Sequence, residues 1–321
     1  MKEDHKERII AELTENEDIE IREDELMKRH TWLRIGGPAD LFLIPDNREA
    51  FIKIIKKLNR VDMPYHILGS GSNILVADRG IRGAVISLLR LDMIEIRDEK
   101  VTAQAGCSLA ELAEITAWHG LAGLEFASGI PGTLGGAIYM NAGAYGGEMK
   151  DVLERVEVLD LGEEKTEDLP PQRLGLDYRT SRLQSGGMIA LTATIKLQRD
   201  DPAEILDRIA ELECRRWFKQ PLKHPSAGSA FKRPENDYAG RLIEAAGLKG
   251  KKMGGAQVSP KHAGFIINRD KASAEDVLRL MKLIRRRVKD EFDITLEPEP
   301  RPLGDFDPGQ LDPLFPDGTA V

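Results

Sequence analysis

Apolar residues recur at helical spacing in several stretches of the chain. Phe51, Ile54 and Ile55 share one face of a helix that is predicted to begin after Asp46 or Asn47 and to run to about residue 59. Ser108 and Glu111 form a capping box that opens a helix ending near residue 119. Further helices are predicted over about 203–218, 238–246 and 274–292, the last one capped at Ser273.

Short apolar runs, separated by glycine-rich turns, predict strands between these helices. The runs cover 41–44, 65–68, 74–77, 84–88, 101–105, 152–161, 188–197, 264–268 and 294–297. The pattern of predicted elements changes after residue 200, where longer helices replace the short strands. The pattern predicts an α+β protein with a boundary near 198–202, a charged helical lead-in over 1–29 and a loose, Pro/Asp/Gly-rich acidic tail over 305–321.

Composition narrows the classes of function. The length of 321 residues favours two or three modules, and the net charge of −8 argues against bulk nucleic-acid binding. A local pocket of Arg and Lys could still hold a small anionic ligand. Neither the two cysteines nor the six histidines show metal-ligand spacing, so no metal site is expected.

The same features predict where the protein works. Two isolated thiols are typical of a reducing compartment. The charged N-terminal segment lacks the apolar region of a signal peptide, and no stretch approaches the roughly 18 apolar residues of a membrane span. A cytoplasmic protein without a membrane span is therefore expected.

A first glycine loop lies between two predicted strands. Gly69, Ser70, Gly71, Ser72 and Asn73 can place backbone N–H groups and polar side chains around a diphosphate. The loop is not a Rossmann fingerprint, because the third glycine is missing and a strand rather than a helix follows. Taken alone, it is either a cofactor loop or a tight strand connection.

A second, longer glycine loop runs from residue 128 to residue 147. So many glycines inside a structured chain indicate close approach of the backbone to something large, although a long structural loop is the alternative. Two such loops together favour a dinucleotide. The candidate cofactor-binding residues here are Ser128, Gly129, Ile130, Pro131, Gly132, Thr133, Gly135, Gly136, Asn141 and Gly143.

The order of the motifs resembles one family. TxxRIGGPA, LGSGSNIL, ASGIPGTLGGAIYMNAGAYG, DYRTS, PSAGSAFKRP, an apolar strand and LEPEPR follow one another as in the UDP-N-acetylenolpyruvoylglucosamine reductase family, over about residues 25–304. The resemblance implies an FAD-binding module of the vanillyl-alcohol-oxidase (PCMH) type, made of two α/β subdomains, over 30–200. It also implies a C-terminal α+β substrate-binding domain over 201–304.

The resemblance implies a reaction as well. Bound FAD, with NADPH as co-substrate, would reduce UDP-N-acetylglucosamine enolpyruvate to UDP-N-acetylmuramate for peptidoglycan synthesis. Arg179 matches the family residue that holds the substrate carboxylate as enolate charge builds, and Ser229 matches the proton donor. Glu299 matches the acidic partner by its spacing from Arg301, although Glu297 would point the same way in a strand. Pro300 stands where the family usually has an aliphatic residue, so the placement of Glu299 is in question.

Contacts to the UDP-sugar follow from the same match. The candidate substrate-binding residues are Tyr178, Lys219, Arg233, Lys249 and His262. Arg179 and Ser229 are 50 positions apart, which resembles the shorter class of the family, in which no Tyr-bearing loop closes over the substrate.

Two other functions are kept as alternatives. A related flavoprotein could oxidise an alcohol or a sugar, and a covalent flavin link would then need Cys107 or His119, neither of which lies in a glycine loop. A non-catalytic nucleotide-binding regulator would lack the ordered set of Arg, Ser and Glu that this chain contains.

Overall fold

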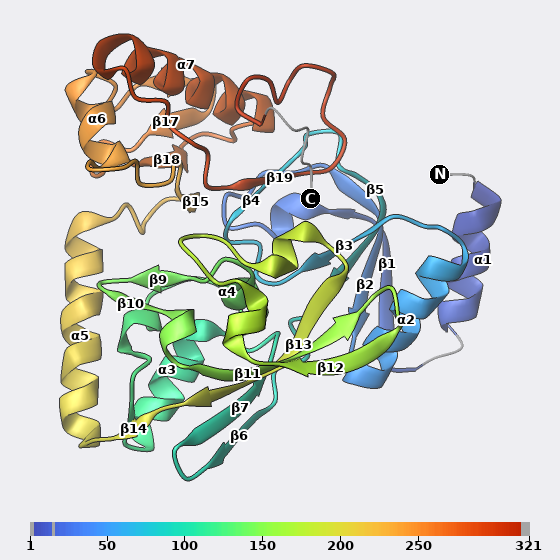
Figure 1. Cartoon of the computed structure of the whole chain (residues 1–321). Coiled ribbons are helices and arrows are strands. Elements are labelled where there is room, and N and C mark those ends of the chain that lie inside the picture. The colour runs from blue at the N-terminus through green and yellow to red at the C-terminus, as the bar shows by residue number, and fades with distance from the viewer. Residues whose placement is uncertain (1–2, 15–16, 316–321) are drawn as a thin grey trace.

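A four-stranded sheet forms the N-terminal part of the computed structural model, which describes residues 3–14 and 17–315. Its strand order is β1-β2-β5-β3, with β2 parallel to β5 and β5 parallel to β3. Helices α1 and α2 cover one face (Figure 1). The Asn47 side chain accepts the N–H of Ala50 and starts α2, as its sequence predicts. The bounds are α1 Glu3–Thr14, β1 Ile19–Leu26, β2 Pro38–Pro45, α2 Arg48–Arg60, β3 Tyr65–Leu68 and β5 Ile81–Ser87.

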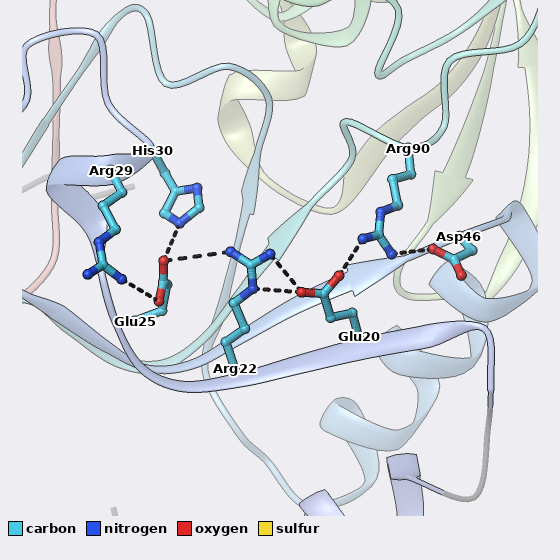
Figure 2. Close-up of polar contacts among 7 residues, drawn as sticks. All are labelled: Glu20, Arg22, Glu25, Arg29, His30, Asp46 and Arg90. Atoms are coloured by element: carbon cyan, nitrogen blue, oxygen red, sulfur yellow. Dashed lines mark hydrogen bonds and ion pairs between the residues drawn. The ribbon is translucent and has the colours of Figure 1, made fainter.

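Strand β1 corrects the expectation of an all-helical lead-in, because residues 19–26 pair antiparallel with β2. An ion-pair network anchors this edge strand (Figure 2). Glu20 pairs with Arg22 on β1 and with Arg90, and Arg90 reaches Asp46. The second half of the network centres on Glu25, which contacts Arg22, Arg29 and the Nε2 of His30, the last at 2.8 Å.

A five-stranded antiparallel sheet forms the next layer, in the order β12-β11-β13-β7-β6. Helices α3 and α4 pack on it and share an apolar core with its strands. Ser108 caps α3 by accepting the N–H of Glu111, which is the Ser108 half of the predicted capping box. Two α/β subdomains are thus present, and the first includes β1, which lies before the predicted start at residue 30. The bounds are β6 Ile94–Arg97, β7 Lys100–Gln104, α3 Leu109–Trp118, α4 Leu134–Tyr139, β11 Leu153–Asp160, β12 Lys165–Leu169 and β13 Met188–Lys196.

Helix α5, Pro202–Lys219, belongs physically with the first module although it opens the second segment. Ile205 and Ile209 pack against Ala117 of α3, and the helix lies along that side of the molecule (Figure 1). Two-stranded pairings of β8 with β14 and of β9 with β10 complete this part. Their bounds are β8 Leu121–Ala122, β9 Gly143–Ala144, β10 Gly147–Glu148 and β14 Gln198–Arg199.

The C-terminal module is a sheet in the order β15-β18-β17-β16, covered by helices α6 and α7 (Figure 1). Ser273 and Asp276 form the capping box that starts α7. Asp78, from the first module, also accepts the N–H groups of Ala274 and Glu275, which ties the two modules together. The bounds are β15 Ser226–Ser229, α6 Ala239–Ala245, β16 Lys252–Met253, β17 Ala256–Val258, β18 Phe265–Asn268 and α7 Ala274–Phe292.

The chain then returns to the first module. The strand predicted over 294–297 is absent from the structure; instead β19, Arg301–Leu303, pairs parallel with β4, Ile74–Val76. The described part of the acidic tail is not loose, because Leu314 is buried and Phe306, Leu311 and Phe315 pack on the C-terminal core. Residues 316–321 lie outside the described residues. Within the described part of the chain, no helix is both long and apolar enough to cross a membrane.

Candidate active site

The two glycine loops meet in the structure. A Cβ at Gly69 would lie 2.4 Å from the Oγ1 of Thr133, and one at Gly132 would lie 3.5 Å from the Oγ of Ser72. Gly71 adopts a left-handed φ of 65°, and a Cβ there would lie 2.0 Å from the carbonyl oxygen of His30. Glycine is therefore required at 69 and 71, since only a residue without a Cβ lets these segments approach so closely.

Arg179 and Glu299 form a partly buried ion pair across 120 positions of sequence. The Nε of Arg179 donates to Glu299 at 2.7 Å, and its Nη2 donates to the carbonyl of Gly143 at 3.1 Å. The two side chains are only 21% and 13% exposed. The structure thus brings together two of the three predicted catalytic residues.

The backbone of Arg179 is strained, with a φ of 52°. A left-handed conformation at a residue other than glycine costs on the order of 1–3 kcal/mol and persists only where the surroundings impose it. Here the Asp177 and Thr180 backbones pair with each other, and Ser181 donates its hydroxyl to the carbonyl of Tyr139 at 2.7 Å. The turn is held from both sides, which aims the guanidinium at Glu299.

Ser229 lies one residue from the segment that pairs with Glu299. The N–H of Glu299 donates to the carbonyl of Ala230 at 3.2 Å, and Ala230 in turn donates to the carbonyl of Gly264. Gly228 has a φ of 75°, and the pairing of β15 with β18 shifts register between Ser226 and Ser229. A bulge of this kind redirects a side chain at a strand end, here next to the acidic segment.

The structure distinguishes the two carboxylates that the sequence left equivalent. Glu297 is 71% exposed and pairs with Lys232 at 3.3 Å, whereas Glu299 is only 13% exposed and pairs with Arg179. Pro300 is buried among apolar side chains between the modules, and the preceding residue, Glu299, still forms its ion pair with Arg179. Asn73 fixes the segment on its other side, because its Nδ2 donates to the carbonyl of Glu299 at 3.3 Å and its carbonyl accepts the N–H of Arg301 at 2.9 Å.

Burial raises the pKa of Glu299 above the ordinary value of a glutamate, although the charge and hydrogen bond of Arg179 and the charge of Lys232 oppose the shift. At a given pH, the neutral, protonated form of Glu299 is therefore more populated than that of a solvated glutamate. A carboxyl group that gains a proton becomes a hydrogen-bond donor, which an ionised one cannot be.

Three residues predicted to bind the cofactor make close contacts within the protein. Asn141 is fully buried; its amide donates to Glu148 at 2.6 Å and to the carbonyl of Asp177 at 3.2 Å, and its oxygen accepts from Lys150. Gly143 packs against β10, and Gly135 packs against Ala105. In this structure Asn141 and Gly143 support the turn that carries Arg179, and their assignment as cofactor ligands stays a prediction.

Tyr178 and Arg233 meet across the boundary between the modules. The hydroxyl of Tyr178 accepts the backbone N–H of Arg233 at 3.1 Å, and its ring lies under the guanidinium of Arg179 at 5.1 Å. The Arg233 guanidinium stacks over Tyr238 at 4.2 Å. Both predicted substrate residues thus border the Arg179 turn.

The remaining substrate candidates form a second group. His262 lies within the electrostatic reach of Lys249 and Lys219. Burial, with the charges of Lys249 and Lys219, lowers the pKa of His262 against a backbone hydrogen bond and the charge of Glu244, so the imidazole is neutral near pH 7. Its Nδ1 accepts the N–H of Gly264 at 3.1 Å, which places the ring proton on Nε2 as a donor. Lys249 pairs with Glu244 at 2.7 Å.

Arg216 is a further candidate site residue, which the sequence did not single out. It is 6% exposed, its Nε has no hydrogen-bond partner among the described residues, and a Cβ at Gly129 would lie 2.5 Å from its Nη1. Its guanidinium also lies 5.6 Å from the ring of Tyr145. The available signal was an arginine in register with Ile205 and Ile209 on the apolar face of α5.

The fold and this site define a class, that of FAD-binding oxidoreductases with a separate substrate domain. A family model described as "FAD binding domain" matches residues 39–169, and one described as "UDP-N-acetylenolpyruvoylglucosamine reductase, C-terminal domain" matches residues 220–303. The second match begins just beyond α5, in agreement with the packing of that helix on the first module. The predicted PCMH-type α+β architecture is confirmed.

Relatives identify the family. The UDP-N-acetylenolpyruvoylglucosamine reductase of Caldanaerobacter subterraneus subsp. tengcongensis is 50% identical over 88% of this chain and 93% of its own length. That of Clostridium tetani is 45% identical over 94% of this chain and 98% of its own. The crystal structure of the Thermus caldophilus reductase superposes with a TM-score of 0.74 at 39% identity, covering 88% of this chain and 98% of that one. The chain belongs to the UDP-N-acetylenolpyruvoylglucosamine reductase family.

Two buried polar atoms fit FAD at the meeting of the glycine loops. The Oγ of Ser70 has no hydrogen-bond partner within the described ranges, and the Nε of Arg216 is in the same state beside Gly129. Buried polar atoms in folded proteins are nearly always paired, so orphans beside glycine loops indicate a ligand that carries acceptors. The phosphates and ring oxygens of FAD are such acceptors.

Proposed function

We propose that this protein reduces UDP-N-acetylglucosamine enolpyruvate to UDP-N-acetylmuramate with NADPH, through FAD held between the glycine loops, with Arg179, Glu299 and Ser229 as the catalytic residues. The partly buried Arg179–Glu299 pair carries the proposal, because it joins a cation to an acid of raised pKa, and the backbone of Glu299 is hydrogen-bonded to Ala230, the neighbour of Ser229. FAD, when bound, supplies the hydride chemistry that no side chain can provide.

Residues 69–73, 128–133 and 136 would form the cofactor cradle, with Ser70 and Arg216 as donors to it. Backbone N–H groups in such loops suit a diphosphate. The alternative of a tight strand connection does not account for the orphaned Ser70 hydroxyl. Asn73 would act indirectly, since its amide holds the carbonyl of Glu299.

Arg179 would bind the substrate carboxylate and stabilise the enolate that develops as hydride reaches the alkene terminus. A guanidinium suits this role through its two parallel donors and permanent charge. When the substrate carboxylate binds Arg179, Glu299 would remain shielded from solvent. The charge of Arg179 would then compensate the negative charge of Glu299 less fully. Glu299 would then take up a proton and donate to the enolate oxygen, while Ser229 gives a proton to the carbon that bears the carboxylate.

Lys219, Lys249 and His262 would meet the UDP moiety, together with Tyr178 and Arg233 at the Arg179 turn. The Lys219–Lys249–His262 group supports this assignment because two cations and a donor imidazole gather in an otherwise acidic protein. The substrate would be held without a Tyr-bearing closing loop. The nucleotide-linked substrate and the free thiols of Cys107 and Cys214 suit the cytoplasm.

The function is tested by following the visible flavin absorbance of purified protein through two half-reactions. NADPH is expected to bleach the band, and UDP-N-acetylglucosamine enolpyruvate to restore it under anaerobic conditions. A simple alcohol or sugar that bleaches the band, with no response to the enolpyruvyl substrate, would establish the oxidase alternative instead. A protein that does not bind FAD would exclude both.

Gly69→Ala is expected to weaken FAD binding by about 5- to 140-fold, because the new methyl group collides with Thr133 at the junction of the loops. Overpacking of about 1–3 kcal/mol corresponds to that change, at about 1.4 kcal/mol per factor of ten. Quenching of FAD fluorescence on titration into apoprotein measures the affinity. Gly162→Ala is the control, since its Cβ would meet only Asp160 at 3.4 Å, and unchanged affinity in Gly69→Ala would contradict the cradle.

A further inference from the structure

Gln184 joins three segments that surround the catalytic ion pair. Its Nε2 donates to the carbonyl of Arg179 at 3.1 Å and to the carbonyl of Tyr139, at the end of α4, at 2.8 Å. Its Oε1 accepts from the Nη2 of Arg301, two residues beyond Glu299. One partly buried amide thus uses both of its donors and its acceptor on different parts of the site.

The hydrogen bond from Gln184 to the carbonyl of Arg179 acts on a strained part of the backbone. Arg179 has a left-handed φ of 52°, a conformation that residues other than glycine rarely adopt. A donor on that carbonyl stabilises the left-handed conformation against relaxation. The contact to Arg301 acts on Glu299, the other member of the ion pair. Arg301 and Glu299 lie on the same short segment, and the backbone of this segment is hydrogen-bonded to Asn73.

We propose that Gln184 is a positioning residue for the reduction: it holds Arg179 in its strained conformation and links it to the segment that carries Glu299. The inference rests on the proposed function, since it assigns Gln184 to the same site. An amide suits the role because it donates twice and accepts once while neutral, whereas a lysine or glutamate would supply only one of these capacities. Gln184 would not touch the substrate.

The proposal predicts a selective defect. Gln184→Met keeps the length of the side chain and removes all three hydrogen bonds. Gln184→Glu keeps an acceptor for Arg301 and loses both donors to Tyr139 and Arg179. Both variants are expected to slow reoxidation of the flavin by the enolpyruvyl substrate about 10- to 100-fold, the scale of a small misplacement of a reacting group.

Flavin reduction by NADPH, FAD affinity and melting temperature are measured on the same preparations and are expected to stay close to wild type. Ser185→Ala is the matched control, because this adjacent hydroxyl bonds only to the carbonyl of Arg182. A merely structural role would lower melting temperature and FAD affinity together with both half-reactions, and that outcome would overturn the proposal.

Two further results would also overturn it. Wild-type reoxidation in Gln184→Met would show that the three hydrogen bonds are dispensable. Wild-type reoxidation in Gln184→Glu alone would show that the contact to Arg301 suffices and that the bond to Arg179 does not matter. A wild-type protein that fails to reduce the substrate at all would instead overturn the proposed function, so the two failures are distinguishable.

Discussion

Ser229→Ala should leave flavin reduction by NADPH unchanged and slow reoxidation by the enolpyruvyl substrate by about 100- to 10,000-fold, the range for loss of a general acid. The two half-reactions differ because only the second delivers a proton to a substrate carbon. Stopped-flow absorbance of the flavin band separates them. The backbone hydrogen bond from Glu299 to Ala230, the residue after Ser229, brings the segment of this serine next to the segment that carries Glu299.

Ser226→Ala is the matched control for this experiment, since it removes a hydroxyl from the other end of the same short strand. It is expected to behave as wild type in both half-reactions. Ser229→Cys, which restores a proton donor, should recover part of the rate. An equal loss in both half-reactions of Ser229→Ala would remove this residue from the role of acid.

Glu299→Ala should slow substrate-driven reoxidation about 100- to 1,000-fold, as expected for removing a donor to a developing oxyanion. The pH dependence is the more specific prediction. Burial raises the pKa of Glu299, so its neutral form persists to higher pH than that of a solvated glutamate. If the neutral form is the donor, the rate is full below this raised pKa and falls about tenfold per pH unit above it.

Glu299→Gln tests the assignment, because an amide donates at every pH. This variant should react more slowly than wild type, more quickly than Glu299→Ala, and without the fall on the alkaline side. Glu297→Gln is the control, as Glu297 is exposed and paired with Lys232. An alkaline limb that survives unchanged in Glu299→Gln would assign the titration to another group.

Much of the fold could be predicted from local sequence. Asn47, Ser108 and Ser273 cap the helices that they were predicted to start, because a cap is satisfied by N–H groups two or three residues away. The glycine loops and the order of the motifs likewise lie within short stretches. These local motifs and their order in the sequence therefore indicated the family, the FAD-binding architecture and the types of residue available for catalysis.

Contacts between distant segments were decided only by the tertiary structure. Glu299 differs from Glu297 because Arg179, 120 positions away, faces one and not the other. Arg216 lies beside Gly129 because α5 packs on the first module, and the described part of the acidic tail packs on the C-terminal core through its apolar residues. Local patterns of hydrophobic and polar residues specify which face of an element is buried, but the partner of that face depends on how the whole chain packs.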